Sequence, residues 1–145
     1  MKVLLDTNVV LDQLLTREPH VGPAEQVMSL VDTGRLEGLV CSTTVTTIHY
    51  LASKAIGAVA AREHLRTLLT IFDVACVDRD VLRGALDSGF ADFEDAVVHE
   101  AALGSGAAAI VTRDIKGFAA SKLPVFSPVE FLAALRAERH NSRSK

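Results

Sequence analysis

Short continuous apolar runs that alternate with segments of helical spacing constrain the fold of this chain more than any other feature of the sequence. Five such runs occur, at residues 3–5, 39–41, 72–77, 108–111 and 125–126. The spacing of apolar residues predicts helices at about 7–15, 23–33, 48–57, 58–70, 80–88, 90–103 and 128–139. Buried strands separated by helices are typical of a mostly parallel sheet that is covered on both faces. We therefore predict an α/β fold, a three-layer α/β/α sandwich with a central sheet of about five strands.

The length of 145 residues suits a single domain, which we place at residues 1–140, with 141–145 as a frayed tail. No stretch of about eighteen apolar residues occurs, which excludes a membrane-spanning helix. Asp6 follows the first apolar run too soon for a signal peptide, so we expect a cytoplasmic protein. Cys41 and Cys76 each end an apolar run, so we expect reduced, buried thiols and no zinc site.

Charge is distributed unevenly along the chain, although the net charge is only −3. This small net charge argues against a protein that binds nucleic acid by bulk charge alone. Residues 113–145 carry seven basic and three acidic side chains, whereas residues 1–112 carry eight basic and fifteen acidic ones. The basic end favours a polyanion held near acidic groups with metal cations between them, and a solvated terminal tail is the alternative.

Two of the predicted strands run into aspartates. Asp6 follows residues 3–5, and Asp114 follows residues 108–111 after a threonine and an arginine. Because function in parallel sheets gathers beyond the carboxyl ends of the strands, both side chains would share one crevice if the strands are neighbours. A strand-end aspartate can also be only a helix cap, and both readings stay open for each residue taken alone.

A third group of acids opens the helix near residue 92. Asp92 and Asp95 are three residues apart and share a helix face. The helix dipole favours acids in a first turn, which accounts well for Asp92 and Glu94. Asp95 precedes the apolar Ala96-Val97-Val98, as in a buried helix, where a carboxylate is costly unless a cation compensates it.

Converging carboxylates without a lysine or arginine between them repel one another and are held together by a divalent metal. Oxygen ligands suit Mg²⁺ or Mn²⁺, and such ions support phosphodiester hydrolysis by activating water and neutralising phosphate charge. Asn8 and Thr112 are placed to orient the ligands or the substrate. A phosphatase of the haloacid dehalogenase type also begins with a strand-end aspartate, but it needs a second acid where Asn8 stands.

Four short motifs, spread over nearly the whole chain, resemble those of the PIN domain family and of its VapC-type toxin ribonucleases. Each motif is weak alone, but four in this order and at these separations are fairly specific. They are Asp6-Thr7-Asn8, Asp92-Phe93-Glu94-Asp95-Ala96, Ile110-Val111-Thr112-Arg113-Asp114 and Ser127-Pro128-Val129-Glu130-Phe131-Leu132.

The resemblance implies a PIN-like fold in which Asp6, Asp95 and Asp114 are the metal ligands and Asp92 is an accessory acid. It implies an endoribonuclease dependent on Mg²⁺ or Mn²⁺, the toxin of a type II toxin–antitoxin pair, whose partners are RNA, a second copy in a homodimer and an antitoxin that blocks the site. Arg113 would bind a substrate phosphate or neutralise a neighbouring acid.

The sequence departs from the family pattern after the second predicted strand, where PIN domains usually carry a glutamate. The segment 42–50 contains no acid, so Thr47 or a neighbouring hydroxyl would occupy that place and orient water. The alternative function is a catalytically degenerate PIN domain that binds RNA or an antitoxin without cleavage. The many valines and leucines of the first two predicted helices suggest an apolar surface for dimerisation.

Overall fold

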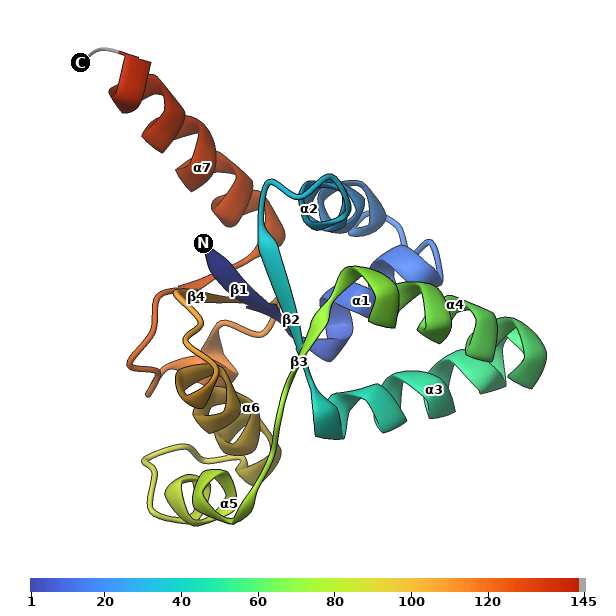
Figure 1. Cartoon of the computed structure of the whole chain (residues 1–145), viewed down its shortest axis with the longest axis horizontal. Coiled ribbons are helices and arrows are strands. Elements are labelled where there is room, and N and C mark those ends of the chain that lie inside the picture. The colour runs from blue at the N-terminus through green and yellow to red at the C-terminus, as the bar shows by residue number, and fades with distance from the viewer. Residues whose placement is uncertain (144–145) are drawn as a thin grey trace.

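A five-stranded sheet lies at the centre of the molecule in the computed structural model, which describes residues 1–143 (Figure 1). All neighbouring strands run parallel, in the order β3-β2-β1-β4-β5. Their bounds are β1 (Lys2–Leu5), β2 (Glu37–Cys41), β3 (Asp73–Ala75), β4 (Ala109–Val111) and β5 (Val125–Phe126). The predicted α/β/α fold is therefore confirmed.

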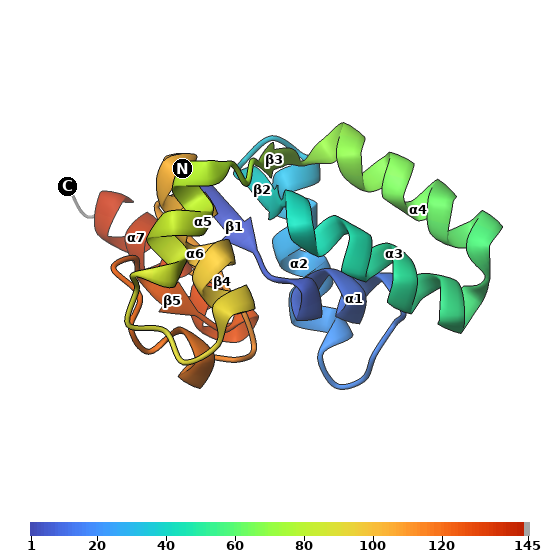
Figure 2. The same ribbon diagram turned by 90° about the horizontal axis from the view of Figure 1, so that it is seen from below.

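Seven α-helices and one short 3₁₀ helix connect the strands within the described residues. They are α1 (Thr7–Leu14), α2 (Val21–Asp32), α3 (Ser42–Ile56), α4 (Ala58–Ile71), α5 (Arg79–Leu86), α6 (Phe93–Gly104), η1 (Lys116–Phe118) and α7 (Pro128–Arg143). The α3–α4 pair, joined at Gly57 with a φ of +89°, extends away from the sheet (Figure 2). Among the described residues, no helix combines the length and the apolar character that a bilayer crossing requires.

The two faces of the sheet carry separate hydrophobic clusters, which create the three layers. In β1, Val3 and Leu5 pack in the cluster that contains the buried side chains of α1, α2 and α4. Leu4 points to the opposite face, where it packs with Ala101 and Ala102 of α6. This alternation follows from the two-residue period of a strand, and small alanines allow α6 to lie close to the sheet.

Three helix boundaries differ from the predicted ones. α6 begins at Phe93 and not near residue 90, because the Asp92 side chain caps it by accepting a hydrogen bond from the Asp95 N–H. α3 begins at Ser42, so the threonine-rich segment forms its first turns. α7 continues past residue 139 to Arg143, so 141–143 are helical, and the rest of the predicted frayed tail, residues 144–145, lies outside the described residues.

The structure bears on two expectations about burial. Val9, Val10 and Val27 of the first two helices are buried in the core, because both helices cover the sheet with an apolar face. Leu14, Met28 and Leu30 of the same helices are only partly buried, so a surface for dimerisation there stays a prediction. Cys41 is buried as expected, but Cys76 is exposed, since it follows β3, a short strand at the edge of the sheet.

Candidate active site

A cleft of about 350 Å³ lies beyond the carboxyl ends of β1 and β4. After these two neighbouring strands the chain turns to opposite sides of the sheet, the arrangement that leaves a crevice in open α/β sheets. Side chains from α1, α3, α6 and the segment after β4 line it. The lining residues are Asp6, Thr7, Asn8, Leu11, Arg17, Thr44, Thr47, Leu51, Glu94, Asp95, Val98 and Asp114.

Asp6 is the most deeply placed acid of the cleft, with 9% of its surface exposed. One carboxylate oxygen accepts a hydrogen bond from the Thr7 N–H at 2.8 Å, which caps α1. The other oxygen accepts from the Thr112 hydroxyl at 2.9 Å. The residue is therefore a helix cap and a cleft acid at the same time, so the two alternatives considered for a strand-end aspartate do not exclude each other.

Hydrogen bonds join the ends of β1 and β4 into one rigid corner. The Thr112 hydroxyl, which donates to Asp6, accepts from the Asn8 amide at 3.2 Å and from the Asp114 N–H at 3.0 Å. The side-chain oxygen of Asn8, Oδ1, accepts a hydrogen bond from the backbone N–H of Arg113 at 3.1 Å. The Thr112 hydroxyl therefore donates one hydrogen bond and accepts two, which is the full capacity of a hydroxyl. Asn8 and Thr112 thus fix where Asp6 and Asp114 lie, in keeping with the orienting role expected of them.

The acids of α6 divide into two kinds. Asp95 and Glu94 line the cleft, whereas the described lining does not include Asp92, whose carboxylate caps the helix at 2.9 Å from the Asp95 N–H. The sequence interpretation explained both Asp92 and Glu94 by the helix dipole, and the family resemblance added an accessory role for Asp92. The structure brings Glu94 into the cleft, and the accessory role of Asp92 remains a prediction.

Gly117, in the 3₁₀ helix after Asp114, leaves open a small space between two of the acids. A Cβ atom at this position would collide with Oδ2 of Asp114 and would stand 2.8 Å from Oδ2 of Asp95. Both carboxylate oxygens therefore border the same small volume. The backbone N–H of Gly117 donates to Oδ1 of Asp114 at 3.2 Å, so the glycine also holds that carboxylate in place.

Burial and mutual repulsion raise the pKa values of two of these carboxyls. Desolvation is the main cause of the raised pKa of Asp6, the charge of Asp114 adds to it, and the hydrogen bond from Thr112 opposes it. Desolvation likewise raises the pKa of Asp95 to about 6, with repulsion from Asp6 as the next cause. Raised pKa values of this origin show that the acids crowd one another in a poorly solvated place, which is typical of functional sites.

The donors and the space of the cleft fit a hard divalent cation. Within the described residues, no three histidine, cysteine or acidic side chains form a ready-made metal centre. Mg²⁺ often binds through one or two carboxylates and keeps several waters, so a full protein cage is not needed. Asp95 and Asp114, with their oxygens at the space beside Gly117, form such a pair, and Asp6 repels both of them.

An ion pair with one fully buried member, Asp12, supports the segment after β4. Asp12 of α1 has no exposed surface, and it accepts hydrogen bonds from Nε of Arg113 at 2.5 Å and from Nη2 at 3.1 Å. Arg17 lies 3.7 Å from the same carboxylate and lines the cleft. Of the two roles considered for Arg113, neutralisation of a neighbouring acid therefore describes its side chain.

The α3 side of the cleft carries hydroxyls where the family pattern has an acid. Thr47 lines the cleft, as expected, together with Thr44. The Thr44 hydroxyl donates to the Cys41 carbonyl at 2.8 Å, so it is already engaged, whereas within the described residues no such bond engages the Thr47 hydroxyl. Thr47 is therefore the hydroxyl that remains available to water or substrate.

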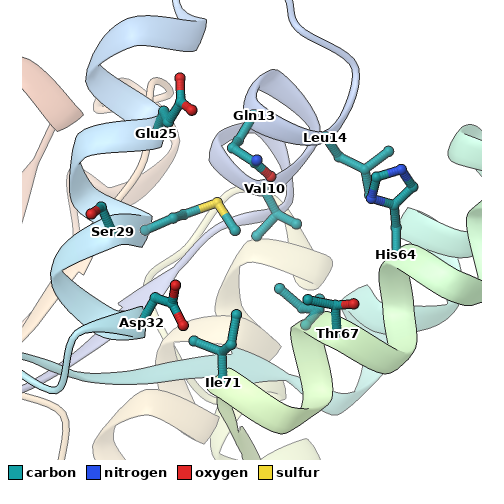
Figure 3. Close-up of a pocket in the computed structure, with 11 residues that line it drawn as sticks. Val10, Gln13, Leu14, Glu25, Ser29, Asp32, His64, Thr67 and Ile71 are labelled. Atoms are coloured by element: carbon teal, nitrogen blue, oxygen red, sulfur yellow. The ribbon is translucent and has the colours of Figure 1, made fainter.

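A second pocket of about 350 Å³ lies between α1, α2 and α4 and shares no lining residue with the cleft (Figure 3). Glu25 and Asp32 of α2 form one wall, and His64 of α4 stands opposite them. These groups come from helix faces and not from strand ends. None of the acids that line the cleft also lines this pocket. We therefore take the cleft that holds Asp6, Asp95 and Asp114 as the candidate active site.

The sequence analysis missed residues that shape the site, among them Asp12, Arg17 and Gly117. A signal for Asp12 was present, because it is the charged residue of the helix segment 9–15, which is apolar apart from Asp12 and Gln13. A charge in such a place needs a partner. Arg17 carried no comparable signal, since it follows the helix in a polar loop and reaches the cleft only through the fold.

The sequence of residues 2–116 matches the family model of the PIN domain. No curated protein is significantly similar to the chain. The fold is similar to that of VapBC2 from Rickettsia felis, bound to a DNA fragment from its promoter, with a TM-score of 0.68, 15% identity and coverage of 86% of this chain and 97% of that one.

Two further solved structures share the fold. A toxin–antitoxin complex from Klebsiella pneumoniae has a TM-score of 0.66, 20% identity and coverage of 87% of this chain and 97% of that one. VapC20 from Mycobacterium tuberculosis, a toxin that cleaves the sarcin-ricin loop, has a TM-score of 0.59, 16% identity and coverage of 74% and 86%.

Proposed function

Because the chain belongs to the PIN domain family, we propose that it is a metal-dependent endoribonuclease, the toxin of a toxin–antitoxin pair. The observation that carries the proposal is the cleft in which Asp6, Asp95 and Asp114, from three separate segments, meet at the carboxyl ends of the sheet. The structural similarity to toxins of such pairs supports the same assignment.

Asp6, Asp95 and Asp114 would hold Mg²⁺ or Mn²⁺. When bound, such an ion lowers the pKa of a water and offsets charge on the phosphate under attack. Thr112 and Asn8 hold the acidic side chains in position through the hydrogen bonds described above. Arg17, which is 40% exposed at the cleft, is placed to contact a substrate phosphate.

The proposed partners are RNA as substrate, an antitoxin that covers the cleft, and a second copy of the chain. The support for an antitoxin is the similarity to proteins solved as toxin–antitoxin complexes. The homodimer rests on the family resemblance and on the apolar side chains of α1 and α2 that are only partly buried, such as Leu14 and Met28.

Cleavage of RNA in the presence of Mn²⁺ tests the proposed activity, with the natural chain compared with Asp6→Asn and Asp95→Asn. We expect cleavage by the natural chain and a loss of at least about a hundredfold in both variants. Asp73→Asn, at an exposed carboxylate on β3, is the control and should cleave normally. Calorimetric titration with Mn²⁺ adds a readout independent of activity, and equal heats for all four proteins would contradict the assigned ligands.

A second candidate function is a PIN domain that binds RNA or an antitoxin without cleavage. It is favoured by one observation, the presence of Thr44 and Thr47, without an acid, on the α3 side of the cleft. The same assay separates the two functions. Undetectable cleavage by the natural chain and by both aspartate variants, with RNA binding intact, would support the binding module and overturn the ribonuclease.

A further inference from the structure

The last two turns of α7 present a row of arginines that the proposed reaction does not use. Arg136, Arg139 and Arg143 are spaced three and four residues apart, so they lie on one face of the helix. Arg35, in the turn before β2, lines the same hollow surface as Arg139 and Arg143. We call these four residues the basic face. All four side chains are exposed.

The charges of the basic face are not neutralised by the protein. Within residues 1–143, none of the four guanidinium groups forms an ion pair with an acid. Glu138 also lines the surface, so the face carries one acid against four arginines. Unneutralised arginines on one surface attract phosphate groups, which they can bind through two parallel hydrogen bonds.

The basic face is not explained by the stability of α7. The first half of the helix packs on α2 through Leu132 and Leu135, whereas the last two turns contribute no residue to the hydrophobic core within the described part of the chain. Cations near a helix C-terminus also favour the helix dipole, but this effect fades beyond the last turn, and Arg136 lies about two turns before Arg143.

We propose that the basic face is a second RNA-binding surface, distant from the cleft, that binds the phosphate backbone of the substrate. It is formed by Arg35, Arg136, Arg139 and Arg143. The choice of RNA rests on the proposed function. Four acids and one arginine, Arg17, line the cleft, so a separate cationic surface adds affinity for a polyanion beyond what Arg17 supplies.

The position of the basic face limits which RNAs it can serve. Met1 and Leu36 line its hollow, at the amino ends of β1 and β2, whereas the cleft lies beyond the carboxyl ends. Strands of four or five residues, at about 3.3 Å per residue, separate the two sites by about 15 Å or more. A dinucleotide cannot contact both sites, whereas a folded RNA can.

RNA binding measured by fluorescence anisotropy in EDTA tests the proposal without any cleavage. The probe is a stem-loop RNA, and the variant changes Arg136, Arg139 and Arg143 to glutamine. We expect binding to weaken about tenfold and the dependence of log affinity on log salt to become shallower by about 2. The matched control changes Arg62, Arg79 and Arg83 to glutamine, which removes the same charge from α4 and α5 and should leave binding within about twofold.

A second variant, with lysine at 136, 139 and 143, keeps the charge and should recover most of the affinity, which separates charge from folding of α7. Equal RNA binding by the natural chain and the glutamine variant overturns the proposal. An equal loss in the control variant also overturns it, because total charge would then explain the effect. Tighter binding of duplex DNA than of the stem-loop RNA overturns the assignment to RNA.

Cleavage in Mn²⁺ distinguishes failure of this proposal from failure of the proposed function. The glutamine variant should raise KM for the stem-loop RNA about tenfold with kcat unchanged, and cleavage of a dinucleotide should not change. If the natural chain cleaves no RNA but the variant loses RNA binding, the ribonuclease fails and the basic face stands. If the natural chain cleaves RNA and the variant matches it in binding and in KM, the ribonuclease stands and the proposal for the basic face fails.

Discussion

Asp95 lies where its negative charge is unfavourable until a cation arrives. Its pKa is raised to about 6, first by desolvation and then by repulsion from Asp6. In the unfolded chain an aspartate loses its proton near pH 3.9, whereas in the fold Asp95 keeps it up to about pH 6. Between these values the folded state binds more protons than the unfolded state, so the stability contributed at this residue falls as the pH rises.

We predict that Asp95→Asn stabilises the metal-free protein at pH 7 by about 1–2 kcal/mol, a range already reduced for partial solvent exposure. The gain should shrink towards pH 4, where Asp95 is neutral in the fold. Urea unfolding in EDTA at pH 7 and at pH 4 measures the free energy of unfolding of both proteins and so gives the gain at each pH. A gain for Asp95→Asn that is the same at both pH values would contradict the assigned cause.

Gly117 provides the space in which two carboxylates meet, and its replacement tests the space and not the ligands. We predict that Gly117→Ala weakens Mn²⁺ binding and slows RNA cleavage by about tenfold or more, because the methyl group displaces the Asp95 and Asp114 carboxylates. The free energy of unfolding should change by less than about 1 kcal/mol, since only side-chain ends must shift.

Gly89→Ala is the matched control for this substitution. The nearest atom to an added Cβ at Gly89 is 4.0 Å away, so this methyl group meets open space. Calorimetry with Mn²⁺ on both variants decides the outcome. If the two alanine variants bind Mn²⁺ equally well, the space beside Gly117 is not where the ion binds.

At the scale of elements, the pair of Asp12 and Arg113 fastens the segment after β4 to α1. Asp12 is fully buried, and the Arg113 backbone is also bonded to Asn8 of the same helix. Removal of one partner from a buried pair leaves the other charge without compensation, which costs several kcal/mol. Arg17, at 3.7 Å from Asp12, retains part of that compensation.

We predict that Arg113→Gln destabilises the protein by about 2–3 kcal/mol and lowers the cleavage rate, because Asp114 directly follows the released residue. Urea unfolding measures the first effect. Arg66→Gln removes an arginine whose partner, Glu63, is exposed on the same helix, and should cost less than about 0.5 kcal/mol. Equal losses in the two variants would mean that the pair with Asp12 does not fasten the loop.

At the scale of the whole molecule, the proposed homodimer is a prediction about assembly. The large apolar side chains that stay exposed lie mainly outside α1 and α2, for example Leu86 of α5 and Phe93 of α6. We expect light scattering at micromolar concentration to give twice the mass of one chain. A single-chain mass across that concentration range would remove the homodimer and leave the fold and the cleft as described.

The sequence by itself determined the layers of the fold, and it singled out three acids that the structure brings to one cleft. Apolar runs and helical spacing are local patterns, and each strand or helix must bury its apolar face against the others, so the order of elements specified a parallel sandwich. Asp6 and Asp114 could be selected because strand ends are recognisable in the sequence, and Asp95 because it precedes an apolar helix segment.

The tertiary structure alone decided what depends on the direction of side chains between distant segments. It placed Glu94 in the lining of the cleft, whereas the carboxylate of Asp92 caps α6. It brought Asp12 of α1 to Arg113 after β4 and buried Val9, Val10 and Val27 in the core. These contacts join residues far apart in the chain, and no local pattern of the sequence encodes their distance or orientation.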